Sequence, residues 1–76
     1  MNTATTVRRY RGSSPQERKA LRRQQLIDAA TRVYGEHGYR HSGVKQVCDA
    51  AGLTQRYFYE SFSHSDELLI ACYEQA

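Results

Sequence analysis

Hydrophobic positions in the first half of the chain recur with the period of an amphipathic helix. The apolar stripe runs through Leu26, Ala30, Val33 and His37, and Ile27 and Tyr34 widen it. Ser14 can cap this helix, Pro15 suits its first position, and Glu17 stands where a capping box needs a carboxylate. Gly38 offers the left-handed residue that commonly ends a helix. The pattern predicts a helix from Pro15 to about His37, whose first two turns are basic and project past the core.

A second, shorter apolar group precedes Gly52. Its face consists of Val44, Val47, Cys48 and Ala51, and we expect Ser42 to cap the helix that carries it. Cys48 is small, as a close crossing of two helices requires. Gly52 can adopt the positive φ of a tight turn between two helices that cross at a steep angle. This segment therefore predicts a short helix that ends in a glycine turn.

A third helix follows the turn directly. Thr54 is a good N-cap, and Leu53 with Phe58 has the spacing of a hydrophobic staple. Phe58 and Phe62 are then expected to point inward together. Two short helices joined by such a turn predict a helix-turn-helix motif.

A fourth helix is predicted to begin between residues 63 and 66, with Ser63 or Ser65 as its cap. Its buried side is predicted to hold Leu68, Leu69 and Cys72. The helix has no stop signal before Ala76, so we expect the chain to be truncated within it. No strand pattern or repeat is visible. The predicted fold is all-α, a three-helix helix-turn-helix domain plus the start of a fourth helix, over residues 14–76.

Basic residues are concentrated at the start of the chain. Residues 1–23 carry seven basic residues and one acid, whereas residues 24–76 have a net charge of −3. Residues 1–13 have no hydrophobic period, so we expect a flexible basic arm, with an idle tail as the alternative. A cationic segment indicates an anionic partner, either nucleic acid or a membrane surface. A membrane-surface helix needs large apolar residues opposite its cations, and between Arg18 and Arg23 only Ala20 and Leu21 are available.

The third helix has a polar outer face. With both phenylalanines turned inward, the remaining faces hold Gln55, Arg56, Tyr57, Tyr59, Glu60 and Ser61. Gln and Arg side chains suit base edges in the major groove, and Tyr hydroxyls suit phosphates. The alternatives are a plain helical module whose glycine turn is only a turn, and a helical protein-interaction module. The second of these needs an apolar outer face, which this helix lacks.

Several separate segments resemble the signature of the tetracycline-repressor (TetR) family. They are Leu26 to Ala30 with Tyr34, Gly38 and Tyr39, Ser42 to Val47, Ala50 to Thr54, Tyr59, Phe62, and Asp66 to Leu69. The resemblance covers Gln25 to about Tyr73. It implies a bacterial homodimeric regulator that places its second and third helices in the major groove of a palindromic operator. It also implies a repressor, released when a small-molecule effector binds a separate C-terminal domain that also dimerises. We expect that domain to be absent from these 76 residues.

The resemblance also assigns candidate DNA contacts. By position, Lys45 and Gln55 resemble base contacts of the family, and Thr54, Tyr57, Tyr59 and Ser61 resemble phosphate or base contacts. Two positions depart from the pattern, because Ser65 stands where the family usually has Lys, and Arg56 where it often has a small residue or Pro. We infer that attraction to the DNA backbone has moved to Arg56 and the arm. The predicted contacts are Ser42, Lys45, Thr54, Gln55, Arg56, Tyr57, Tyr59, Ser61 and Ser65, with Arg8, Arg9 and Arg11 of the arm.

Other chemistries have weaker support. His37 and His41 have zinc-ligand spacing near Cys48, but no second cysteine pair lies at the usual interval, so we expect no metal site. Cys48 and Cys72 are expected as core residues in a reducing compartment. Residues 57–59 could stack on single-stranded nucleic acid, but one of the three aromatic rings must face inward.

Glu60 among the outer residues is expected to be solvated, with a contact to a cytosine amino group as the alternative. No nucleophile with a base and an orienting group can be assembled, so we expect neither an enzyme nor a cofactor. The chain has no stretch of membrane-spanning length, and the expected location is the bacterial cytoplasm, at the nucleoid.

Overall fold

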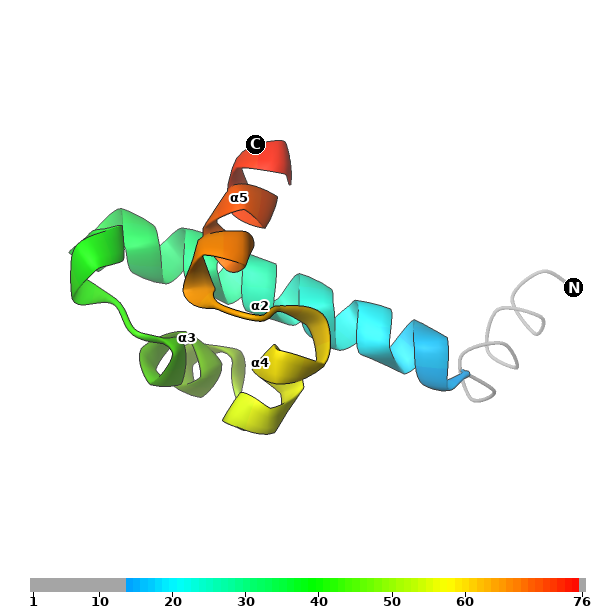
Figure 1. Ribbon diagram of the computed structural model, residues 1–76. Coiled ribbons are helices and arrows are strands. Elements are labelled where there is room, and N and C mark those ends of the chain that lie inside the picture. Colours follow the sequence, from blue (N-terminus) through cyan, green and yellow to red (C-terminus); the bar gives the residue numbers. More distant parts are fainter. Residues whose placement is uncertain (1–13, 76) are drawn as a thin grey trace, which may run out of the picture.

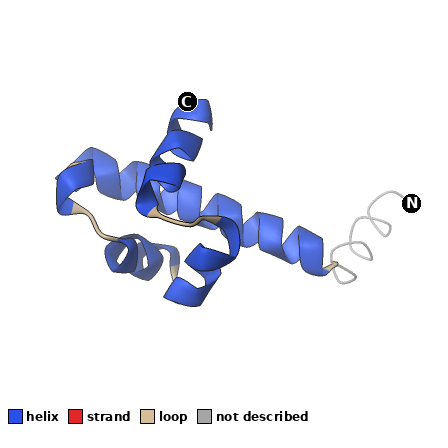
Figure 2. Cartoon of the chain, viewed as in Figure 1, coloured by secondary structure: helices blue, strands red, loops and turns tan. Residues whose placement is uncertain are grey.

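Four α-helices and one short 3-10 helix make up the part of the chain that the structure describes (Figure 1). The structure is a computed structural model, and it describes residues 14–75. The elements in chain order are α2 (Pro15–His37), η1 (Tyr39–His41), α3 (Val44–Ala51), α4 (Gln55–Ser61) and α5 (Ser65–Gln75). Residues 14–75 contain no strand (Figure 2). The all-α fold predicted from the sequence is confirmed.

The long helix α2 is the element on which the others pack. It contacts η1, α3, α4 and α5, with α3 and α4 on one side and α5 crossing it (Figure 1). The core consists of Leu26, Ile27, Ala29, Ala30, Val33, Val47, Cys48, Phe58, Phe62, Leu68 and Ala71. The predicted stripe on α2 is correct except at its end, because His37 is exposed. Ala29, which the stripe omitted, is buried because helices cover α2 from two directions.

The start of α2 forms as its local sequence predicts. The Ser14 hydroxyl accepts a hydrogen bond from the Glu17 N–H at 3.1 Å, and the Ser14 N–H donates to Glu17 Oε1 at 2.9 Å. Pro15 occupies the first turn, where its missing N–H costs no hydrogen bond. This reciprocal pair confirms the predicted capping box.

The segment between α2 and α3 differs from the prediction. Gly38 ends α2 with a positive φ of 83°, but its ψ of 148° is extended rather than left-handed helical. The chain then forms η1, which the hydrophobic pattern did not reveal. The Ser42 hydroxyl donates to the Gly38 carbonyl oxygen at 2.7 Å. Ser42 is therefore not the cap of α3, and the N-cap position belongs to Gly43, which has no side chain to offer.

Two further caps also differ from expectation. Thr54 occupies the N-cap position of α4, but its hydroxyl makes no capping hydrogen bond. At the start of α5, the Glu67 carboxylate accepts a hydrogen bond from the Ser63 N–H at 2.7 Å. Ser65 is the first helical residue there, and its hydroxyl lies 3.1 Å from that of Tyr39. The prediction named Ser63 or Ser65 as the cap. Ser65 does not act as one, because its hydroxyl bonds across to η1, and Ser63 contributes its backbone N–H rather than its hydroxyl.

Candidate nucleic-acid interface

The two faces of α4 have opposite character. Phe58 and Phe62 are buried, with ring centroids 5.6 Å apart, and they hold the inner face against the core. Gln55, Arg56 and Tyr59 are exposed, and Tyr59 keeps 58% of its surface accessible although it is a large aromatic residue. A tyrosine ring is large and its hydroxyl is polar, so exposed Tyr59 beside Gln55 and Arg56 gives this face of α4 both hydrogen-bonding groups and an aromatic surface.

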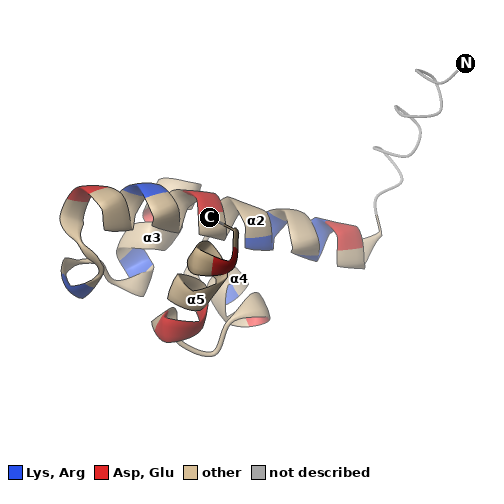
Figure 3. Cartoon of the chain, turned by 90° about the horizontal axis from the view of Figure 1, so that it is seen from above, with Lys and Arg blue, Asp and Glu red and all other residues tan. Residues whose placement is uncertain are grey.

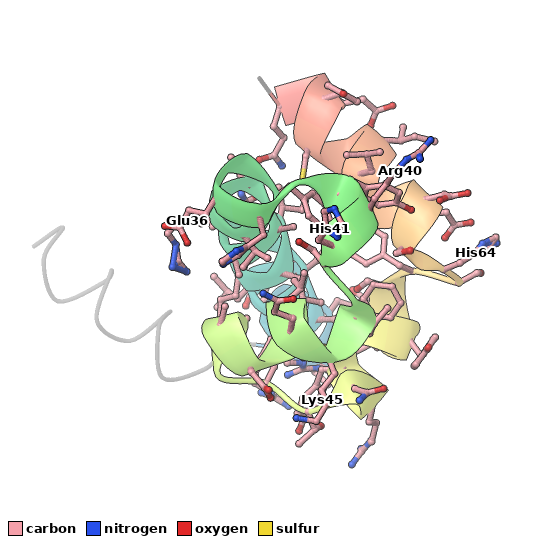
Figure 4. All side chains as sticks on the ribbon, turned by 90° about the vertical axis from the view of Figure 1, so that its left-hand side faces the viewer. Glu36, Arg40, His41, Lys45 and His64 are labelled. Atoms are coloured by element: carbon pink, nitrogen blue, oxygen red, sulfur yellow. The ribbon has the colours of Figure 1, made fainter. Side chains whose placement is uncertain are left out.

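Lys45 of α3 lies on the same side of the molecule as α4. Figure 4 shows its side chain pointing away from the ribbon at the edge formed by these two helices. Its Nζ is 3.0 Å from Asp49 Oδ2, and both side chains are mostly exposed. Exposed pairs one helical turn apart stabilise by only about 0.3–0.5 kcal/mol, so Lys45 can exchange Asp49 for an external acceptor. Gln46, the next residue of α3, is exposed as well and was not among the predicted contacts.

Tyr57 is half-buried, and two arginines lie close to its ring. The Arg22 guanidinium carbon lies 4.4 Å from the centre of the Tyr57 ring, and that of Arg56 lies 5.4 Å from it. A cation over an aromatic face is held by the ring quadrupole, so these contacts limit the movement of both side chains. The arrangement positions Tyr57 and Arg56 together at the α2–α4 junction.

Glu60 forms a two-bond ion pair with Arg22. Arg22 Nε donates to Oε1 at 2.8 Å, and Arg22 Nη2 donates to Oε2 at 2.7 Å. The hydrogen bonds from Arg22 lower the pKa of the Glu60 carboxyl, and nearby Lys19 and Arg56 lower it further. The same pair raises the pKa of the Arg22 guanidinium. The expectation of a solvated Glu60 is therefore wrong, because its carboxylate is paired with Arg22 and only partly exposed.

Three predicted contact residues do not present their hydroxyls on this surface. Ser42 is buried and bonded to Gly38, and the Ser61 Oγ is buried without a hydrogen-bond partner in the structure. The Ser65 hydroxyl is engaged by Tyr39, whose own hydroxyl also donates to Asp66. Six predicted contacts keep exposed or partly exposed side chains, whereas the hydroxyls of these three serines are buried or engaged; the six are Lys45, Thr54, Gln55, Arg56, Tyr57 and Tyr59.

Basic residues line the first half of α2 (Figure 3). Arg23 places its guanidinium carbon 5.2 Å from the centre of the ring of Phe62, the C-cap of α4, so Arg22 and Arg23 of α2 contact Tyr57 and Phe62 respectively. Arg8, Arg9 and Arg11, the predicted contacts in the arm, lie outside the described residues.

The alternative chemistries gain no support. Phe58 is buried, its ring lies edge-on to Tyr59 with centroids 4.8 Å apart, and Tyr57 faces Arg22, so residues 57–59 present no common stacking face. Between residues 14 and 75 no three His, Cys, Asp or Glu side chains gather where they could hold a metal. Cys48 is buried in the core, and burial raises the pKa of its thiol. None of the helices within this range has the length and apolar content needed to cross a membrane.

Comparison with known proteins identifies the motif. The family described as "Bacterial regulatory proteins, tetR family" matches residues 26–72. The chain is 38% identical over 50 residues to the HTH-type transcriptional activator FasR of Mycolicibacterium smegmatis, covering 66% of this chain and 23% of that protein. It is 33% identical over 51 residues to the fatty acid metabolism regulator protein of Bacillus subtilis, covering 67% of this chain and 26% of that protein. No solved structure matches the chain.

These matches give α3 and α4 a role. The matched residues contain η1, α3 and α4 entirely, together with the buried part of α2. The two short helices and the turn between them are the helix-turn-helix of a DNA-binding transcriptional regulator. The matches span about a quarter of the length of each of these two curated relatives.

Proposed function

This chain belongs to the tetR family of bacterial regulatory proteins, and we propose that it reads a specific double-stranded DNA sequence with the outer faces of α3 and α4. The supporting observation is the exposure of Gln55 and Arg56 in the first turn of α4, on a helix whose opposite face is fixed by Phe58 and Phe62. A helix held in this way can present its N-terminal side chains to base edges in the major groove.

Each exposed side chain has a proposed role. Lys45 and Gln55 read bases, since amide and ammonium groups match the acceptors and donors of the major groove. Arg56 contacts a base or a phosphate. The hydroxyls of Thr54, Tyr57 and Tyr59 donate to phosphates, and the absence of a capping bond leaves the Thr54 hydroxyl available for that contact. Ser42, Ser61 and Ser65 are left out of this proposed set because their hydroxyls are buried or engaged.

For the whole protein we propose a homodimer on a palindromic operator in the bacterial cytoplasm. Two helix-turn-helix units on one face of B-DNA require half-sites about 34–36 Å apart, or a multiple of that distance. Dimerisation and a small-molecule effector site belong to a part of the protein beyond this domain. We propose repression relieved by that effector, although one relative is named an activator. A reporter driven by the operator should be silenced by the protein, and higher expression in its presence would contradict repression.

Selection of bound duplexes from a random pool tests the DNA-binding proposal. The full-length protein should enrich one inverted repeat, and a variant with Gln55→Ala should enrich it less sharply at one base pair of each half-site. Recovery of no common sequence would contradict the proposal and would favour the helical protein-interaction module.

A further inference from the structure

The Arg22–Glu60 pair lies where the recognition helix joins the long helix. It connects residues 38 positions apart in the chain, and the two side chains keep 22% and 26% of their surface accessible. The guanidinium places two N–H donors on the carboxylate and its carbon over the Tyr57 ring. A guanidinium that is bound along one edge and stacked on one face has little freedom left.

The charge of this pair matters as much as its geometry. Arg22 and Glu60 together are neutral, although Lys19 and Arg56 act on the same carboxylate. A free guanidinium at this position would attract any phosphate, regardless of sequence. A phosphate that approaches Arg22 must compete with a carboxylate that already fills two of its donors.

We propose that Glu60 is a positioning and specificity residue, which holds Arg22 against the Tyr57 ring and withholds it from the phosphate backbone. The inference rests on the proposed function, since it concerns how α4 discriminates among DNA sequences. Arg56, which is exposed although its guanidinium carbon lies 5.4 Å from the centre of the Tyr57 ring, is left as the arginine that enters the groove. Glu60 thus weakens binding to DNA of any sequence and keeps the outer face of α4 available for reading bases.

The test compares variants of the full-length protein on two fluorescent duplexes, the selected operator and a scrambled sequence, over a series of salt concentrations. Glu60→Gln keeps the shape of the side chain and removes its charge. It should bind the scrambled duplex more tightly, with a salt slope steeper by about 0.9 per subunit because one more phosphate is neutralised. Its preference for the operator should fall.

Two variants control the interpretation. Glu36→Gln removes the same charge from an exposed side chain in the last turn of α2 (Figure 4) and should leave both the preference and the salt slope as in the wild type. The exchange of both residues, Arg22→Glu with Glu60→Arg, rebuilds the pair and should restore the preference that Glu60→Gln loses. Thermal unfolding of each variant establishes that it is folded.

The contrary results are distinct. If Glu60→Gln matches Glu36→Gln in slope and preference, the inference is wrong. It is equally wrong if Glu60→Gln weakens binding to both duplexes in proportion, because a purely structural role gives that result. If the wild-type protein itself does not distinguish the two duplexes, the proposed function fails, and the inference fails with it.

Discussion

The backbone N–H of Leu53 donates to the carbonyl oxygen of Cys48 at 2.9 Å, and this bond closes the turn between the two helices of the motif. The Gly52 N–H donates to the Asp49 carbonyl oxygen at 3.2 Å, completing the paired bonds of a Schellman motif. Cys48 is buried and Leu53 packs against the same core, as this motif often requires. The turn therefore fixes the direction in which α4 leaves α3.

We predict that replacing glycine by alanine has opposite effects on the free energy of unfolding at Gly52 and at Gly35. Gly52 has a φ of 74° and a ψ of 27°, so Gly52→Ala should lower the free energy of unfolding by about 1–2 kcal/mol, the cost of a left-handed L-residue. Apart from adjacent residues and the backbone of the same helix, no atom lies within 4 Å of an added Cβ at Gly52 or at Gly35, so steric contact does not decide either outcome. Gly35 lies within α2, where Ala should stabilise by about 0.5–1 kcal/mol. Denaturant titration measures both values, and effects of the same sign would refute this account of the turn.

Alkaline pH should destabilise the domain through Tyr34. Burial, followed by the neighbouring Tyr39, Cys72 and Asp66, raises the pKa of Tyr34 from 10.0 to about 12. The folded state therefore holds this proton more tightly than the unfolded chain does. The resulting stabilisation is complete below pH 10 and is lost as the pH rises toward 12. Unfolding free energies measured across this range should fall less steeply for Tyr34→Phe than for the wild type.

Tyr73 provides the matched control for that titration. It is 74% exposed, so Tyr73→Phe removes a phenol without changing the buried environment. The Tyr73→Phe variant should lose stability between pH 10 and 12 as the wild type does. An equal flattening of the profile in both variants would show that burial of Tyr34 is not the cause.

Base contacts and phosphate contacts should separate by mutation. Gln55→Ala should relax the preference at one base pair of each half-site, by about 1–3 kcal/mol. Tyr59→Phe removes only a hydroxyl and should weaken binding to all duplexes alike, since phosphate contacts carry no sequence information. A panel of single-base operator variants distinguishes the two profiles. The assigned roles would be wrong if both substitutions gave the same profile.

Features set by neighbouring residues could be predicted from the sequence. The capping box of Ser14 and Glu17 and the glycine turn at Gly52 depend on residues close together in the chain. The inward direction of Phe58 and Phe62 follows from helical spacing once the helix is identified. The same spacing predicts the exposed residues of α4, because they lie on the helix faces that Phe58 and Phe62 do not occupy. These residues are Gln55, Arg56 and Tyr59.

Features that depend on distant partners could not be predicted. Glu60 and Arg22 are far apart in sequence, and only the packing of α4 on α2 makes them neighbours. Ser42 has two possible local roles, as a cap or as a donor to a carbonyl, and the backbone at Gly38 decides between them. The Tyr39 hydroxyl reaches Ser65 and Asp66 only because η1 places it against α5.

Residues 1–13 should contribute electrostatic attraction to DNA without contributing to the core. Their deletion removes Arg8, Arg9 and Arg11 and keeps the Ser14 capping box. The slope of log K against log salt should become shallower by up to about 3 per subunit, because each neutralised phosphate contributes about 0.9. The melting temperature should hardly change. Equal slopes for the deleted and intact proteins would show that this segment is an idle tail.

The affinity ratio for two duplexes tests sequence-specific DNA binding most directly. Fluorescence anisotropy at one fixed, physiological salt concentration gives the Kd of the full-length protein for its selected operator and for a scrambled duplex of the same composition. We predict an operator Kd lower by about 10³-fold or more, the range of specific regulators over their own non-specific binding. A ratio near one would contradict the account, since the exposed side chains of α3 and α4 would then read no sequence.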